Sequence, residues 1–193
     1  MAVTTLDERT ALVVIDLQNA VAALPVAPYS AADVITRTAE LATAFRARSL
    51  PVVLVRVRAT PADSVPGRTE YQRPSGGTPV PDGSDIVPAL AGHPEDIIVT
   101  KRNWGGFYGT DLDLHLRRRG ITQIVLTGIA TSIGVDTTAR EAYAHGYHVT
   151  LATDAMSDLS AEGHAFTLQT IFPRLGESGT TTEILELLEK PRP

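Results

Sequence analysis

Two charged residues and one polar turn stand where a parallel sheet would bind its ligands. Asp16 closes the apolar run TALVVID, Lys101 closes DIIVTK, and the turn TGIATSIGVDTTAR (127–140) overlaps the end of QIVLTG. Parallel α/β sheets bind ligands outside the carboxyl ends of their strands. A carboxylate and an ammonium facing a helix N-terminus there can transfer protons and stabilise an anion. A structural salt bridge at the sheet edge is the alternative, and composition does not decide between the two.

The elements that would position these residues alternate along the chain. Short apolar runs rich in β-branched residues predict strands buried on both faces at 10–16, 51–57, 96–101, 123–128 and 147–153. Ala, Leu and Phe at helical spacing predict helices at 31–49, 110–120, 132–146, 160–176 and 181–190, and Gly120 and Gly146 are placed as C-terminal stops. This alternation predicts an α/β fold with a parallel sheet covered by helices.

Length and composition restrict the class of protein. The 193 residues, 43% of them hydrophobic, favour one domain spanning 1–193. The net charge of −5 does not indicate a basic surface that would bind nucleic acid. The basic cluster at 117–119 fits a helix C-terminus before Gly120. No apolar run is long enough for a membrane span, and there is no cysteine for disulfides or thiol catalysis. We therefore expect a cytoplasmic protein that binds neither nucleic acid nor membranes.

One long connection interrupts the alternation of strands and helices. Residues 59–83 are rich in Pro, Gly and Ser and contain little to bury. The same sheet pattern resumes after it, so we interpret it as a long surface loop rather than a linker between domains. Loops of this length within one domain are usually functional or mobile.

Three motifs together resemble the isochorismatase-like hydrolases, also called the cysteine hydrolase superfamily. They are LVVIDLQN (12–19), VTKRNWGGF (99–107) and VLTGIATSIGVDTTAREAYAHGYHVTLATDAMSD (125–158), and they occur in the family's order. The resemblance implies a three-layer α/β/α, Rossmann-like sandwich with a mostly parallel sheet of about six strands. It also implies a catalytic set of Asp, Lys and usually Cys, which falls here on Asp16, Lys101 and Gly134.

The glycine at position 134 decides which family chemistry is available. Most members attack a carbonyl carbon with the cysteine thiolate, and a glycine cannot supply that nucleophile. The true isochorismatases also carry a glycine there and cleave a vinyl ether with the Asp as proton donor. We therefore expect a hydrolase that acts on a small molecule through Asp16 and Lys101. A lapsed paralogue that serves as a binding or scaffold protein is the alternative.

The residues at the positions that would contact the substrate differ from those of the isochorismatases. Val57 stands where the resemblance implies a substrate-binding Gln, and the sequence 130–132 replaces a Tyr-Ala-His run. Losing side chains that hydrogen-bond a substrate strongly changes which substrates a site prefers. We therefore expect a substrate other than isochorismate. We assign substrate binding to a set of residues near the motifs: Gln18, Trp104, Phe107, Ile129, Ala130 and Thr131.

Four further expectations accompany the resemblance. The family implies a cis peptide between Ile129 and Ala130. No histidine follows the second predicted strand in RVRATPAD (56–63), where nicotinamidases hold a metal, so we expect neither metal nor cofactor. The family also implies a homodimer or homotetramer. Trp104 and Phe107 would line a pocket or pack at a subunit contact.

Overall fold

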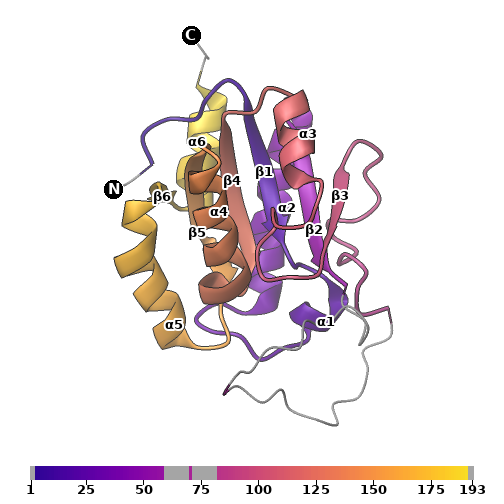
Figure 1. Cartoon of the computed structure of the whole chain (residues 1–193), viewed down its shortest axis with the longest axis vertical. Helices are drawn as coiled ribbons and strands as arrows, with labels where there is room; N and C mark the ends of the chain where they lie inside the picture. The colour runs from indigo at the N-terminus through magenta and orange to yellow at the C-terminus, as the bar shows by residue number, and fades with distance from the viewer. Residues whose placement is uncertain (1–2, 59–69, 71–81, 191–193) are drawn as a thin grey trace.

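A six-stranded parallel sheet forms the centre of the molecule (Figure 1). The computed structural model describes residues 3–58, 70 and 82–190. The strands are β1 (Thr10–Ile15), β2 (Val52–Val57), β3 (Ile97–Lys101), β4 (Gln123–Ile129), β5 (His148–Ser157) and β6 (Glu177–Gly179), in the order β3-β2-β1-β4-β5-β6. All neighbouring strands pair in parallel, which confirms the predicted fold class.

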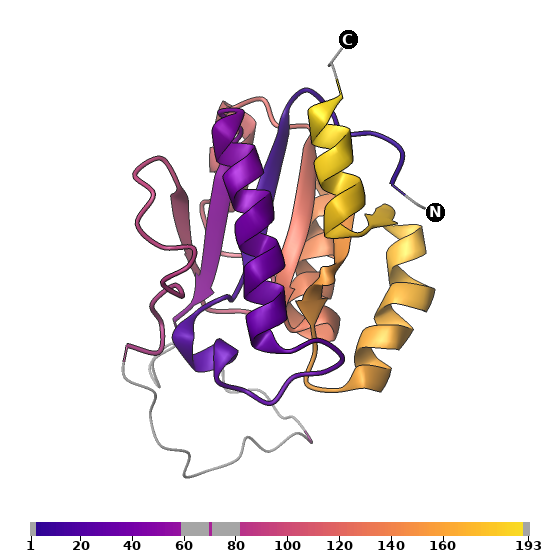
Figure 2. The same ribbon diagram turned by 180° about the vertical axis from the view of Figure 1, so that it is seen from behind.

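Helices cover both faces of the sheet. Figure 2 shows α2 (Ala31–Ala47) and α6 (Thr181–Glu189) on one face. Figure 1 shows α3 (Leu112–Arg118), α4 (Asp136–Ala144) and α5 (Ala161–Phe166) on the other. The short helix α1 (Asn19–Ala22) follows the first strand. The result is the three-layer arrangement that the resemblance implies.

The central strand β1 shows why both faces are covered. All of its residues are buried, and successive side chains point to opposite faces of the sheet. Leu12 and Val14 join the core under α2 and α6, whereas Val13 and Ile15 join the core under α3 and α4. A strand with two apolar faces needs a helix layer on each.

The predicted strands and helices all have counterparts in the structure, but two of the helices depart from regular α geometry. The helix predicted at 132–146 begins as a π turn, η2 (Thr131–Val135), and the larger departure lies near the C-terminus. The predicted helix at 160–176 is instead α5 followed by a π turn, η3 (Thr167–Ile171), and a 3-10 turn, η4 (Phe172–Arg174). Pro173 lacks the N–H that a regular helix would use, so the α-helical hydrogen-bond pattern cannot continue there. The strand β6 has the sequence ESG, which carries no apolar run to predict it.

The strand order reverses beside β1, because β2 and β4 flank it on either side. This is the topological switch point at which α/β sheets bind ligands. The predicted loop at 59–83 lies almost entirely outside the described residues. Within the described part of the chain, no helix has the length and apolar character needed to cross a membrane.

Candidate active site

Asp16 lies at the carboxyl end of β1, at the switch point of the sheet. Its backbone N–H donates to the Val55 carbonyl, and its φ of 55° is in the left-handed region that residues other than glycine seldom adopt. Its side chain is buried, since the residue is only 7% exposed. Backbone outliers of this kind cluster at functional sites, where the surrounding structure enforces them.

Lys101 reaches Asp16 from the end of β3, which lies one strand beyond β2. Its Nζ is 2.8 Å from Asp16 Oδ2 and donates a second hydrogen bond of 2.6 Å to the carbonyl of Trp104. The residue is 2% exposed. Strand ends that are separated in sequence thus bring a carboxylate and an ammonium into one buried ion pair.

Gly134 completes the group in η2 (Thr131–Val135), the π turn that leads into α4. A Cβ at this position would lie 3.2 Å from Asp16 Oδ2, 3.4 Å from Lys101 Nζ and 3.0 Å from Ile15 Cγ2. The structure therefore brings Asp16, Lys101 and Gly134 together at the carboxyl edge of the sheet.

The electrostatics of Asp16 reflect two opposing effects. Burial raises the pKa of its carboxyl to about 6, even though the neighbouring Lys101 ammonium lowers it. Oδ1 of Asp16 is buried and has no hydrogen-bond partner among the described residues. A carboxyl group with a raised pKa and one oxygen without a partner in the described part of the chain is suited to donate and accept a proton near neutral pH.

The turn after β4 holds the first residues of η2 against β1. Gly128 has a φ of 125°, and a Cβ there would lie 2.0 Å from the Ile15 carbonyl oxygen, so only glycine fits. The predicted cis peptide between Ile129 and Ala130 is confirmed. The Ala130 carbonyl accepts hydrogen bonds from the N–H groups of Ile133 and Val135.

Asp158, which the sequence analysis did not select, fixes the same turn from the end of β5. This buried carboxylate accepts hydrogen bonds from the backbone N–H groups of Ser132, Leu159 and Ser160. The predicted strand ended at 153, whereas β5 continues to Ser157, so the rule that selected Asp16, a polar residue at the carboxyl end of a buried strand, could not find Asp158 from the sequence.

Thr131 and Gln18 are buried in polar networks of the protein itself. Thr131 Oγ1 lies 3.0 Å from the Ser157 carbonyl and 2.9 Å from His164 Nδ1. Burial lowers the pKa of that imidazole. Gln18 Nε2 donates to the carbonyls of Val57 and Gly83, and its Oε1 accepts from the Val57 N–H. Gln18 thus ties the end of β2 to the segment that follows β1.

Two of the aromatic and apolar candidates are buried in the hydrophobic core. Phe107 is 6% exposed and stacks on the ring of His145 at a centroid distance of 5.1 Å. Ile129 is buried in the core beneath α2 and α6. Trp104 contributes its backbone carbonyl to Lys101, while its side chain is 66% exposed.

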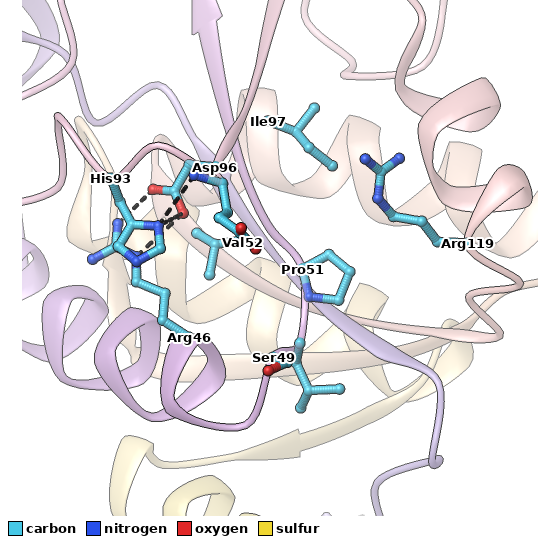
Figure 3. A pocket seen from close by; sticks show the side chains of 10 residues that line it. Arg46, Ser49, Pro51, Val52, His93, Asp96, Ile97 and Arg119 are labelled. Atoms are coloured by element: carbon cyan, nitrogen blue, oxygen red, sulfur yellow. Dashed lines mark hydrogen bonds and ion pairs between the residues drawn. The ribbon is translucent and has the colours of Figure 1, made fainter.

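Two cavities, of about 180 and 330 Å³, lie at the opposite, amino-terminal edge of the sheet. Figure 3 shows the smaller one, where Arg46 and His93 face Asp96. None of the predicted site residues lines either cavity. Among the described residues, no group of three or more His, Cys, Asp and Glu side chains is arranged to hold a metal ion.

Comparison with known proteins gives consistent matches over most of the chain. Residues 10–183 match the model of the isochorismatase domain. A solved structure of an isochorismatase family protein from Burkholderia thailandensis is 49% identical, with a TM-score of 0.90 over 96% of this chain and 98% of that chain. An uncharacterized isochorismatase family protein of Bacillus subtilis (strain 168) is 44% identical over 93% of this chain and 94% of its own length. A ureidoacrylate amidohydrolase of Methylobacterium radiotolerans is 33% identical over 79% of this chain and 69% of its own length.

Proposed function

The chain belongs to the isochorismatase family of hydrolases, and we propose that it hydrolyses a small molecule through acid–base chemistry of Asp16 and Lys101, without a covalent intermediate on the enzyme. The observation that carries this proposal is the buried Asp16 carboxyl, which binds Lys101 through one oxygen and has no described partner on the other. When Asp16 is protonated, that second oxygen can deliver the proton to a substrate.

Vinyl ether hydrolysis suits this arrangement because it requires an acid but no nucleophilic side chain. Asp16 protonates the double-bond carbon, which leaves an oxocarbenium ion. Water adds to the oxocarbenium carbon and returns a proton to Asp16. The resulting hemiketal breaks into a carbonyl compound and an alcohol, so the enzyme ends in its starting state.

Lys101 and Gly134 support this reaction in different ways. An ammonium has three N–H donors, and within the described residues the hydrogen bonds to Asp16 and Trp104 use two of them; we propose that the third holds an anionic group of the substrate. Gly134 leaves open the space that a Cβ would occupy beside both charged groups. The backbone N–H groups of Ser132, Ile133 and Val135 in the same turn already donate to Asp158 and to the Ala130 carbonyl, so the Lys101 ammonium is the group proposed to hold negative charge on the substrate.

Amide hydrolysis is the reaction to distinguish from this one. The relative from Methylobacterium radiotolerans is named as an amidohydrolase. In the cysteine-dependent members, the resemblance implies that a thiolate at position 134 attacks the carbonyl. Gly134 cannot form that bond, so we expect no covalent amide turnover by this chain.

A substrate panel tests the proposal. Wild type and Asp16→Asn are compared on carboxylate-bearing vinyl ethers, on amides and on N-carbamoyl compounds, with products followed by mass spectrometry. Vinyl ether turnover that disappears in Asp16→Asn supports the proposal. Amide turnover by wild type contradicts it, and so does binding of panel compounds without turnover, which would favour a lapsed paralogue.

We also propose that the chain assembles as a homodimer or homotetramer. Two aromatic side chains near the site, Trp104 and Tyr108, are 66% and 72% exposed in the single chain. Large exposed aromatic groups are typical of interface cores. Light scattering at micromolar concentration is expected to give a dimer or tetramer mass, and a monomer mass would contradict this part of the proposal.

A further inference from the structure

The position of the Lys101 ammonium depends on the carbonyl of Trp104. Lys101 Nζ donates to that carbonyl at 2.6 Å and to Asp16 Oδ2 at 2.8 Å. The exposed Trp104 side chain does little to anchor its own backbone. Some other contact must therefore hold residues 104–107, the segment after β3 that carries the carbonyl.

Two side chains of α4 supply that contact. Thr138 Oγ1 accepts a hydrogen bond of 3.0 Å from the Gly106 N–H and donates one of 2.6 Å to the Gly134 carbonyl. Glu141 Oε2 accepts a hydrogen bond of 2.9 Å from the Phe107 N–H. Residues three apart in a helix lie on the same face, so both side chains hold the segment from one side.

The two glycines of the WGGF motif fit closely against these side chains. A Cβ on Gly105 would lie 2.1 to 2.4 Å from the carboxylate atoms of Glu141. A Cβ on Gly106 would lie 3.3 Å from Thr138 Cγ2 and 3.2 Å from Leu112 Cδ2. Any larger residue at position 105 would displace the carboxylate from the Phe107 N–H.

We propose that Thr138 and Glu141 are positioning residues that hold segment 104–107, so that the Trp104 carbonyl keeps Lys101 against Asp16. The inference rests on the proposed function of Asp16 and Lys101, and it assigns a role to two residues that do not touch the reacting groups. The same hydroxyl of Thr138 also joins the segment to Gly134, so one helix holds both the segment behind Lys101 and the turn that carries Gly134.

The direction of the Asp16 pKa distinguishes positioning from a simple charge effect. If Glu141→Ala releases the segment, Lys101 moves away from Asp16, and the pKa of Asp16 rises because the ammonium no longer favours the carboxylate. Loss of the Glu141 negative charge alone would lower that pKa instead, since one repelling charge is removed. The two mechanisms therefore predict opposite signs.

Carbon-13 NMR of the Asp16 carboxyl, titrated in the folded full-length protein, measures this pKa without a substrate. We expect Glu141→Ala to raise it by roughly one unit. Glu141→Gln is the matched control, because its amide oxygen still accepts from the Phe107 N–H while the charge is gone, and it should stay close to wild type. A folded Glu141→Ala protein whose Asp16 pKa is unchanged or lowered would overturn the inference.

A second pair of variants, at Thr138, tests the same inference if Glu141→Ala does not fold. Thr138→Val preserves the shape but loses the hydroxyl and should also raise the Asp16 pKa, whereas Thr138→Ser keeps the hydroxyl and should restore it. An unchanged pKa in Thr138→Val contradicts the inference. Absence of turnover by wild type would instead contradict the proposed function, so the two failures are distinguishable.

Discussion

Replacing Asp16 with Asn tests whether burial or the ion pair dominates the energetics of the site. Burial raises the pKa of Asp16 from an ordinary 3.8 to about 6, although Lys101 Nζ is only 2.8 Å away. A group whose pKa is higher in the folded state binds its proton more tightly there. Its contribution to stability is complete below the unfolded pKa and is lost as the pH rises through the folded pKa.

The size of this effect follows from the two pKa values. A shift of about two units corresponds to about 3 kcal/mol when fully expressed. Between about pH 4.5 and about pH 7.5, the linkage relation gives a change of about 2 kcal/mol. The free energy of unfolding of wild type, relative to Asp16→Asn, should therefore fall by that amount over this range.

Urea denaturation of both proteins at the two pH values measures this difference directly. The Asn side chain does not titrate, so the Asp16→Asn protein is the reference for the contribution of the carboxyl. Carbon-13 NMR of the Asp16 carboxyl in wild type gives its pKa independently. A relative stability that stays constant or grows with pH would refute the reasoning, because it would mean that attraction to Lys101 outweighs burial.

Four other outcomes follow from the same geometry. If Asp16 is the acid, kcat/KM should fall about tenfold per pH unit above pH 6 and stay level below it; a rate that rises with pH would contradict this role. Gly134→Cys should lower turnover and cost about 1–3 kcal/mol of stability, because its Cβ lies 3.2 Å from Asp16 Oδ2; amide turnover appearing only in this variant would show a lapsed cysteine hydrolase. Gly128→Ala should cost more than about 4 kcal/mol, since its Cβ would lie 2.0 Å from the Ile15 carbonyl, and a melting temperature near wild type would exclude that contact. Gln18→Leu should cost about 2 kcal/mol or more by leaving its backbone partners unsatisfied, which urea denaturation measures against wild type.

The local pattern of the sequence was sufficient to predict most of the fold. Strands buried on both faces consist of β-branched runs, and helix ends carry their own stop residues, so both signals are readable within a few positions. The cis peptide before Ala130 came from family resemblance rather than from any local signal. The strand β6 was missed because its pairing with β5, not its own side chains, makes it a strand.

The roles of single residues depended on contacts between distant parts of the chain. Gln18 and Phe107 stand beside functional motifs, yet the tertiary structure places the first in a backbone network and the second in the core. A position in a motif indicates which edge of the sheet a residue is near. It does not indicate which way the side chain points or what it contacts.

Residue type and strand-end position were thus sufficient to select Asp16 and Lys101 from the sequence, because parallel strands direct their carboxyl ends to one edge, whereas Gly134 was selected through the family resemblance. Only the tertiary structure decided that one oxygen of Asp16 meets Lys101 while the other has no partner among the described residues, and that Thr138 and Glu141 bind the segment behind that lysine. Those properties arise from burial and from distances of a few ångströms between elements far apart in the chain, which no local pattern encodes.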